Sequence, residues 1–123
     1  MRVVICEPNR FSEIINIENS LKMYQSVVGG NIQAIYPFDD PVALVCNENA
    51  KIEGLELNRC LKKDGVIYDI IAGTFFICGF TEDDFCELTE SQADAYKKAF
   101  RFPQYFLTDI SGNIIAINRY TEL

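Results

Sequence analysis

Runs of apolar residues, several of them rich in valine and isoleucine, predict a chain built mostly of β-strands. The most strand-like run is 74–78, and the continuous apolar run 42–46 is typical of a central strand. Neighbouring runs separated by turn residues predict antiparallel hairpins at both ends of the chain. The expected strands span residues 2–6, 13–17, 31–36, 42–46, 65–71, 73–80, 105–108 and 113–117.

Two segments have apolar residues at helical spacing. The first runs from Leu21 to Val28, where Asn19 or Ser20 can cap its beginning by accepting a backbone hydrogen bond. Gly29 and Gly30 follow, and glycine can end a helix because it adopts the left-handed conformation without a Cβ clash. We therefore expect a short helix that ends at this glycine pair.

The second helix is expected between Thr89 and Phe100. Thr89 and Gln92 have the spacing of a capping box, in which each side chain accepts a hydrogen bond from the other residue's backbone amide. Apolar residues from Ala93 onward form a stripe along one side. Pro103 marks the break after this helix.

The pattern is less decisive in three segments. Residues 47–51 are expected to form an exposed polar loop, and residues 81–87 an acidic loop. Residues 52–63 are ambiguous, with a helical turn expected near 58–61. Together the elements predict a single α+β domain over residues 1–123, in which two amphipathic helices pack on one face of a mostly antiparallel sheet.

Charge narrows the range of partners. The 123-residue chain has a net charge of -7, which opposes binding to a nucleic-acid backbone or to an anionic membrane. An acidic mimic of nucleic acid would need carboxylates spaced along one face. Here the acids are scattered, with clusters only at Asp39-Asp40 and within 82–87, so this alternative is the weaker one.

Cysteine usage indicates a reducing compartment. The five cysteines are odd in number and contain no C-x-x-C pair, and three lie in apolar strand-like runs. We expect free thiols and a cytoplasmic protein. The N-terminal apolar stretch is too short for a signal peptide, and no apolar run approaches the ~18 residues that span a membrane.

The sequence offers no recognisable catalytic or metal-binding motif. It contains no histidine, which removes the commonest general base and metal ligand. The best acidic cluster, 82–84 with Glu87, lacks the glycine and the alternating oxygen ligands of a calcium loop. We therefore expect no catalytic residue, no metal and no cofactor.

Four polar residues lie in or beside the central strand-like segments: Asn47, Glu48, Asn58 and Arg59. They can form a small polar recognition site, since loops held by a rigid sheet often carry binding residues. Alternatively, the asparagines satisfy backbone groups of turns and Arg59 pairs with a surface acid. The second interpretation is favoured.

Two further regions are candidates for contact with a partner. Asp83 lies in the acidic loop, and Tyr105 lies with Phe102 and Phe106 at the break after the second helix. If the helix leaves these aromatic residues uncovered, they form an apolar patch of the kind that partners use. Burial in the core is the favoured alternative for them.

Five segments occur in a fixed order along the chain: 27–33, 42–51, 57–59, 71–79 and 88–92. In this order and spacing they resemble the DUF3846 family of uncharacterised bacterial and phage proteins, in a match that covers about residues 1–100. Residues 101–123 are then expected to form a hairpin extension outside the common core. The resemblance implies an intracellular setting, often on phages, plasmids or integrated elements, and implies no catalytic residue.

The leading hypothesis is a non-enzymatic binding or regulatory protein of a phage or mobile element that acts through protein–protein contacts. The first alternative is a small-ligand-binding protein or an enzyme that uses Asn47, Glu48 and Arg59. The second is the acidic mimic of antirestriction type. A protein partner is expected, without membrane or nucleic-acid backbone binding, and the oligomeric state stays open.

Overall fold

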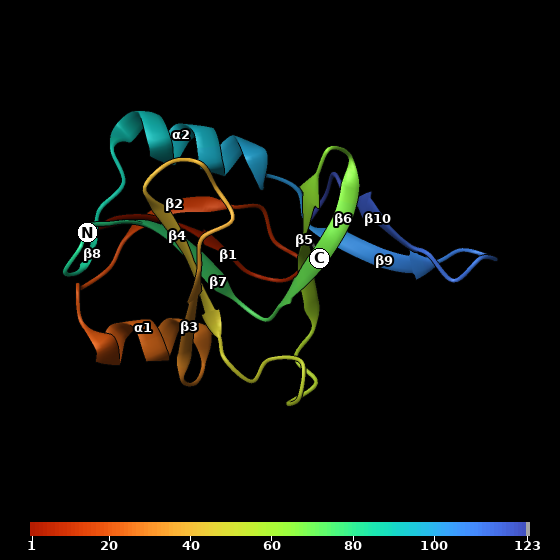
Figure 1. The fold of residues 1–123 in the computed structure, drawn as a ribbon, viewed down its shortest axis with the longest axis horizontal. Helices are drawn as coiled ribbons and strands as arrows, with labels where there is room; N and C mark the ends of the chain where they lie inside the picture. The colour runs from red at the N-terminus through yellow and green to blue at the C-terminus, as the bar shows by residue number, and fades with distance from the viewer. Residues whose placement is uncertain (123) are drawn as a thin grey trace.

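The fold is a central antiparallel sheet with a helix on each side and two hairpins at one end (Figure 1). The structure is a computed structural model and describes residues 1–122. The helices are α1 (Leu21–Val28) and α2 (Glu90–Ala99). The strands are β1 (Arg2–Cys6), β2 (Glu13–Asn16), β3 (Ile32–Ile35), β4 (Val42–Asn47), β5 (Leu57–Lys63), β6 (Val66–Ala72), β7 (Phe75–Phe80), β8 (Phe85–Cys86), β9 (Gln104–Thr108) and β10 (Ile114–Asn118).

The main sheet has the strand order β2-β1-β7-β4-β3, with the short β8 added to β7. Every neighbouring pair in it is antiparallel. The remaining strands form two separate hairpins, β5–β6 and β9–β10. The predicted α+β class with a mostly antiparallel sheet is therefore confirmed.

The two helices pack on opposite faces of the sheet, so the expectation that both lie on one face is wrong. Alternate residues of the central strands enter two separate cores: Leu44 belongs to the core under α2, whereas Val45 belongs to the core under α1. Figure 1 shows the sheet lying between the two helices. All six residues of β4 are buried, as expected of a strand covered on both faces.

Local signals set the ends of both helices. The Ser20 side chain accepts a hydrogen bond from the Met23 amide at the start of α1, and Gly29 ends that helix in the left-handed conformation with φ 77°. At the start of α2, Thr89 and Gln92 form the reciprocal capping box. These three sequence predictions are confirmed.

Two loop predictions and one helical turn are corrected by the structure. Residues 58–61 lie in β5 because their backbone pairs with β6, rather than forming a helical turn. Asn47 and Ala50 are buried instead of exposed, and Asn47 is the last residue of β4, where it pairs with Ile32 of β3. The acidic loop contains β8, which pairs with the end of β7.

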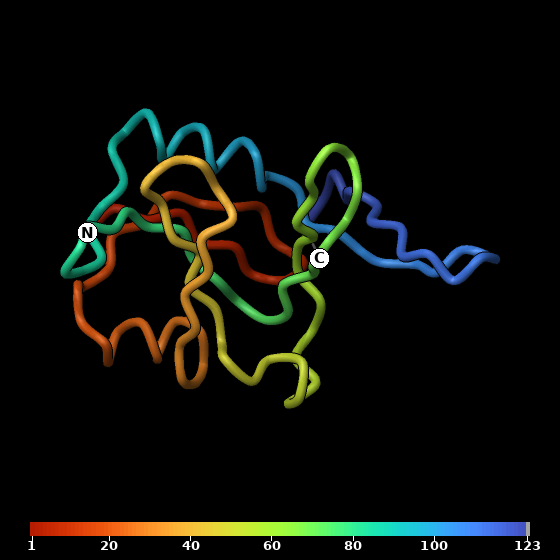
Figure 2. The backbone as a smooth tube through the Cα atoms, viewed as in Figure 1, coloured from red at the N-terminus to blue at the C-terminus, as the bar shows by residue number. Residues whose placement is uncertain are grey.

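The β5–β6 and β9–β10 hairpins lie together at the end of the molecule opposite β8, and the tip of β9–β10 projects away from the body (Figures 1 and 2). The Gln104 side chain accepts a hydrogen bond from the Cys60 amide at 2.9 Å, which joins the two hairpins. At the base of the β9–β10 hairpin, the Phe102 ring packs against Phe11 and Tyr120, with ring centroids 5.9 and 4.7 Å away.

Neither helix of the described chain, at 8 and 10 residues, is long enough to cross a membrane.

Candidate functional site

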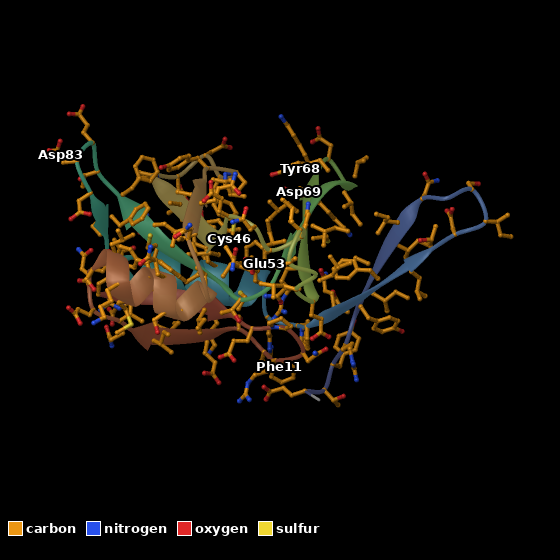
Figure 3. The ribbon with its side chains drawn as sticks, turned by 90° about the horizontal axis from the view of Figure 1, so that it is seen from below. Phe11, Cys46, Glu53, Tyr68, Asp69 and Asp83 are labelled. Carbon is orange, nitrogen blue, oxygen red and sulfur yellow. The ribbon has the colours of Figure 1, made fainter. Side chains whose placement is uncertain are left out.

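The candidate residues named from the sequence lie at separate places. Asn47 and Glu48 border a cavity of about 160 Å³, whereas Arg59 borders another of about 360 Å³. Asp83 is exposed at the end of the molecule far from the β9–β10 hairpin (Figure 3). Tyr105 lies on β9 and is 44% exposed. The structure therefore does not bring these residues together into one site.

The two asparagines satisfy backbone groups inside the protein. The side-chain nitrogen of Asn47 donates to the Val28 carbonyl at 3.3 Å, and its side-chain oxygen accepts from the Asn49 backbone amide at 2.8 Å. The Asn58 side chain donates to the carbonyls of Cys6 and Gly73, at 2.8 and 2.9 Å. Both are almost fully buried, so their polar atoms hold the fold and are not presented to a ligand.

Arg59 is buried, with 1% of its surface exposed, and the expectation that it pairs with a surface acid is wrong. Its Nε donates to the carbonyl of Phe100 at 3.1 Å, and its Nη2 to the carbonyl of Arg10 at 2.6 Å. Its Nη1 donates to Asn58 Oδ1 at 2.6 Å and reaches the Glu7 carbonyl at 3.5 Å. Burial lowers the pKa of the Arg59 guanidinium. Arg59 thus ties the end of α2 and the loop after β1 to β5.

The smaller cavity is closed on one side by an ion pair. The Lys51 ammonium lies 2.8 Å from Asp69 Oδ1, and Asp69 also accepts from the Ile70 amide. Figure 3 shows Asp69 and Cys46 in this part of the molecule. Burial raises the pKa of the Cys46 thiol, which lines the same cavity. These groups are paired or protonated at neutral pH.

All five cysteines carry free thiols. Burial raises the pKa of Cys6 to about 12 and that of Cys78 to about 12. Because the thiolate is the nucleophile, thiols with such values are inert at neutral pH. They fill the core as small apolar side chains.

Within residues 1–122, no three histidine, cysteine, aspartate or glutamate side chains come together in a way that could hold a metal ion.

A wide apolar groove lies between the β5–β6 and β9–β10 hairpins, with a volume of about 1000 Å³. Val66 and Tyr68 of β6 line one side, and they are 67% and 55% exposed. Ile114 and Ile115 of β10 line the other, at 50% and 43% exposed. Lys62 is the one charged residue of the lining outside the Lys51–Asp69 pair.

Exposed apolar side chains are concentrated around this groove. Of the twelve large apolar residues exposed in the described chain, nine lie in the β5–β6 hairpin or between residues 105 and 120, and five of these nine line the groove itself. Singly scattered apolar residues are normal on a surface, but a contiguous patch marks an interaction site. We take this groove as the candidate functional site.

Sequence reasoning found Tyr105 at this end of the molecule but missed the groove itself. Each of its walls is a strand from a separate hairpin, and the sequence does not indicate how two hairpins lie relative to each other. One signal was present: the run from 113 to 118 has four apolar residues and no charge. Such a run is unusual for a two-stranded hairpin that has no second layer over it.

Comparison with known proteins gives a family. The model of DUF3846, described as a domain of unknown function, matches residues 1–101. No match is found among curated proteins or among solved structures. The family match covers the main sheet, both helices and the β5–β6 hairpin, whereas β9–β10 lies beyond it.

Proposed function

Since the chain belongs to the DUF3846 family, described only as a domain of unknown function, we propose a function from its surface: a non-enzymatic protein-binding module. Its binding surface is the apolar groove between the β5–β6 and β9–β10 hairpins. The observation that carries the proposal is the concentration of exposed apolar side chains there, on a chain with a net charge of -7.

The shape of the groove favours an extended segment of a partner protein. Both walls are edge strands, since β6 pairs only with β5 and β10 pairs only with β9. An extended peptide can pair with such an edge through main-chain hydrogen bonds, while its side chains enter the apolar groove. Lys62 at the groove would favour an acidic residue beside the apolar segment.

The alternative of a small-ligand or catalytic site at Asn47, Glu48 and Arg59 has less support. The polar atoms of Asn47 are used within the protein, and Arg59 borders a different cavity from Glu48. The buried thiols of Cys6 and Cys78, whose pKa values are raised, supply no nucleophile at neutral pH. A regulatory role for a phage or mobile element, and a cytoplasmic location, stay predictions.

Capture of a partner tests the proposal. The tagged parent and the variants Val66→Asp and Ile114→Asp would be used to capture proteins from an extract of the natural host. Leu21→Asp is the matched control, because Leu21 is 57% exposed but lies on α1 outside the groove. A partner held by the parent and the control but lost by both groove variants supports the proposal.

A partner that all three variants retain contradicts the groove as the binding surface. Adding Asp83→Lys to the series tests the acidic loop, since Asp83 is exposed far from the groove. Loss of the partner in that variant alone would assign binding to the acidic loop instead.

A further inference from the structure

Strand β10 is a free edge whose outward backbone groups can be identified. The Asp109 amide donates to the Asn113 carbonyl, and the Arg119 amide donates to the Pro103 carbonyl. In an antiparallel ladder the residues that bond a given neighbour alternate along the strand. The register between β10 and β9 is regular, so the backbone amides and carbonyls of Ile115 and Ile117 are also directed toward β9. Ile114, Ala116 and Asn118 therefore direct their amides and carbonyls away from β9.

This edge lacks the protection that the edge strands β2, β3 and β6 carry. Strand β2 is four residues long and contains Glu13, and β3 is also four residues long. Strand β6 carries Asp69, and its pairing with β5 has irregular register. Charges, short length and bulges are the devices that keep sheet edges from associating. Strand β10 has five residues and no charge, proline or bulge.

The hairpin also has an apolar face that the described chain covers only in part. Directly opposite residues of an antiparallel pair point to the same face, so Tyr105 and Ile117 share a face with Leu107 and Ile115. Three of these four side chains are more than 40% exposed. A two-stranded hairpin is at best marginally stable alone in water, and added strands stabilise it.

From these observations we propose that β10 pairs antiparallel with β10 of a second copy of this chain, so that β9-β10 and its counterpart form one four-stranded sheet. The proposal rests on the proposed function, because it names the occupant of the same groove wall. The contact is isologous: the same strand supplies both sides, which closes a two-fold dimer.

The geometry of the strand sets the register. Full overlap of the five residues of β10 places Ala116 on the two-fold axis, opposite its own copy. Ile114 then lies opposite Asn118 of the other copy, and these are the residues whose backbone groups point outward. Ile115 lies opposite Ile117. The overlap thus satisfies the hydrogen-bonding alternation of an antiparallel pair.

Charge favours a second copy over a strongly charged partner at this edge. Each chain has a net charge of -7, yet the hairpin from 104 to 118 contains one charged residue, Asp109 at the tip. The hairpin projects from the body (Figure 1), so pairing through it brings two uncharged strands together. No like charges are placed opposite each other in the overlap.

The experiment measures mass by sedimentation equilibrium over a concentration series of the full chain. The parent is expected to shift from 14.0 kDa toward twice that mass as concentration rises. Ile115→Lys is expected to stay monomeric, because a lysine in an edge strand opposes strand addition. Leu107→Lys is the matched control: Leu107 is directly opposite Ile115 on the same face but lies on β9, away from the edge that pairs, so this variant is expected to dimerise.

A second measurement keeps the inference falsifiable if a lysine variant unfolds the hairpin. Ala116→Cys is expected to form a covalent dimer on mild oxidation, whereas Leu107→Cys and the parent with its five native thiols are not. Equal loss of association in both lysine variants would assign the contact to the apolar face and overturn edge pairing. A dimer that survives Ile115→Lys and does not cross-link through Ala116→Cys overturns it as well.

The outcome is separable from that of the proposed function. A parent that stays at 14.0 kDa at every concentration overturns the dimer, while groove-dependent capture of another protein would still support the proposed function. If the parent dimerises but captures no other protein, the result supports the dimer and contradicts groove-dependent capture of another protein.

Discussion

At the residue scale, each of the four buried polar or charged side chains of the described residues, Ser12, Asn47, Asn58 and Arg59, bonds at least one backbone carbonyl. Arg59 is the clearest case, since a guanidinium with 1% exposure bonds three main-chain carbonyls and one asparagine and no carboxylate. One of these carbonyls belongs to Phe100 at the end of α2, where a positive charge also complements the helix dipole.

Replacing Arg59 by alanine is expected to lower the free energy of unfolding by about 3 kcal/mol or more, because buried carbonyls lose their partners. Arg10→Ala is the control. Arg10 forms a half-exposed ion pair with Glu122 at 3.6 Å, and its loss is expected to change stability by less than about 1 kcal/mol. Urea denaturation measures both variants, and equal small effects would contradict the structural role of Arg59.

Burial of the thiols makes stability depend on alkaline pH. The pKa of Cys6 rises from 9.0 to about 12 on folding, so between these values the native state holds a proton that the unfolded state has lost. This contribution is fully present below pH 9.0 and is lost as pH rises toward 12. The slope is about 1.4 kcal/mol per pH unit for one such group.

We expect Cys6→Ala to reduce the alkaline loss of stability by about one group's share, as measured by denaturation midpoints at a series of pH values above 9.0. Cys86→Ala is the comparison, because Cys86 is only half-buried. The same pH dependence in Cys6→Ala and in the parent would contradict the buried, protonated thiol.

At the element scale, most of the strands and both helices could be predicted, because their signals are local. Ser20, Thr89 and Gly29 act within a few residues of their own position. Strand β5 was missed because Asn58 and Arg59 are buried polar residues that break the alternating pattern. The placement of the helices on opposite faces could have been predicted in part. A strand such as β4, which is apolar at successive positions, requires cover on both faces of the sheet.

The end of α1 gives a prediction at this scale. Gly29 has φ 77°, and a Cβ there meets nothing within 4 Å, so a substitution there would be opposed by backbone strain rather than by contact. Gly29→Val is expected to cost about 1–2 kcal/mol, and Gly29→Asn less, because asparagine tolerates the left-handed conformation. Denaturation midpoints compare the two, and equal midpoints for both variants would contradict the cap.

Gly30 differs, because a Cβ there would lie 2.8 Å from the Asn47 side-chain nitrogen. Gly30→Ala is therefore expected to destabilise through the hydrogen bond from Asn47 to Val28. In an Asn47→Ala background the cost of Gly30→Ala should shrink, which a double-mutant cycle measures. If the two changes in the free energy of unfolding are strictly additive, the cost of Gly30→Ala does not arise from contact with Asn47.

At the scale of the whole molecule, the acidic loop and the apolar groove are two separate surfaces. The acidic loop with Asp83 lies at one end of the molecule, and Tyr68 of the groove lies well away from it, nearer the middle (Figure 3). The sequence could predict that both surfaces exist but not which one is hollowed. The groove depends on the side-by-side placement of two hairpins. The hydrogen bond from the Cys60 amide to the Gln104 side chain is one of the contacts that join them.

Salt distinguishes the two surfaces. Binding through the groove is expected to be nearly independent of salt and to weaken in Tyr68→Ala. Binding through the acidic loop would weaken as salt rises, because exposed charges are screened beyond about 10 Å at 0.1 M. Affinity for a captured partner, measured against salt for the parent, Tyr68→Ala and Asp83→Lys, decides between them. A salt-sensitive affinity that only Asp83→Lys alters would contradict the groove.

The most direct test of the central claim, that the groove between the hairpins is the binding surface, is amide hydrogen exchange of the full chain with and without its partner. The partner is a captured protein or, at high concentration, a second copy of the chain. Slower exchange is expected in β10, at the outward amides of Ile114, Ala116 and Asn118, and in β6, with α1 and β8 unchanged. Protection confined to residues 81–87 or 47–51, with β6 and β10 unchanged, would contradict it.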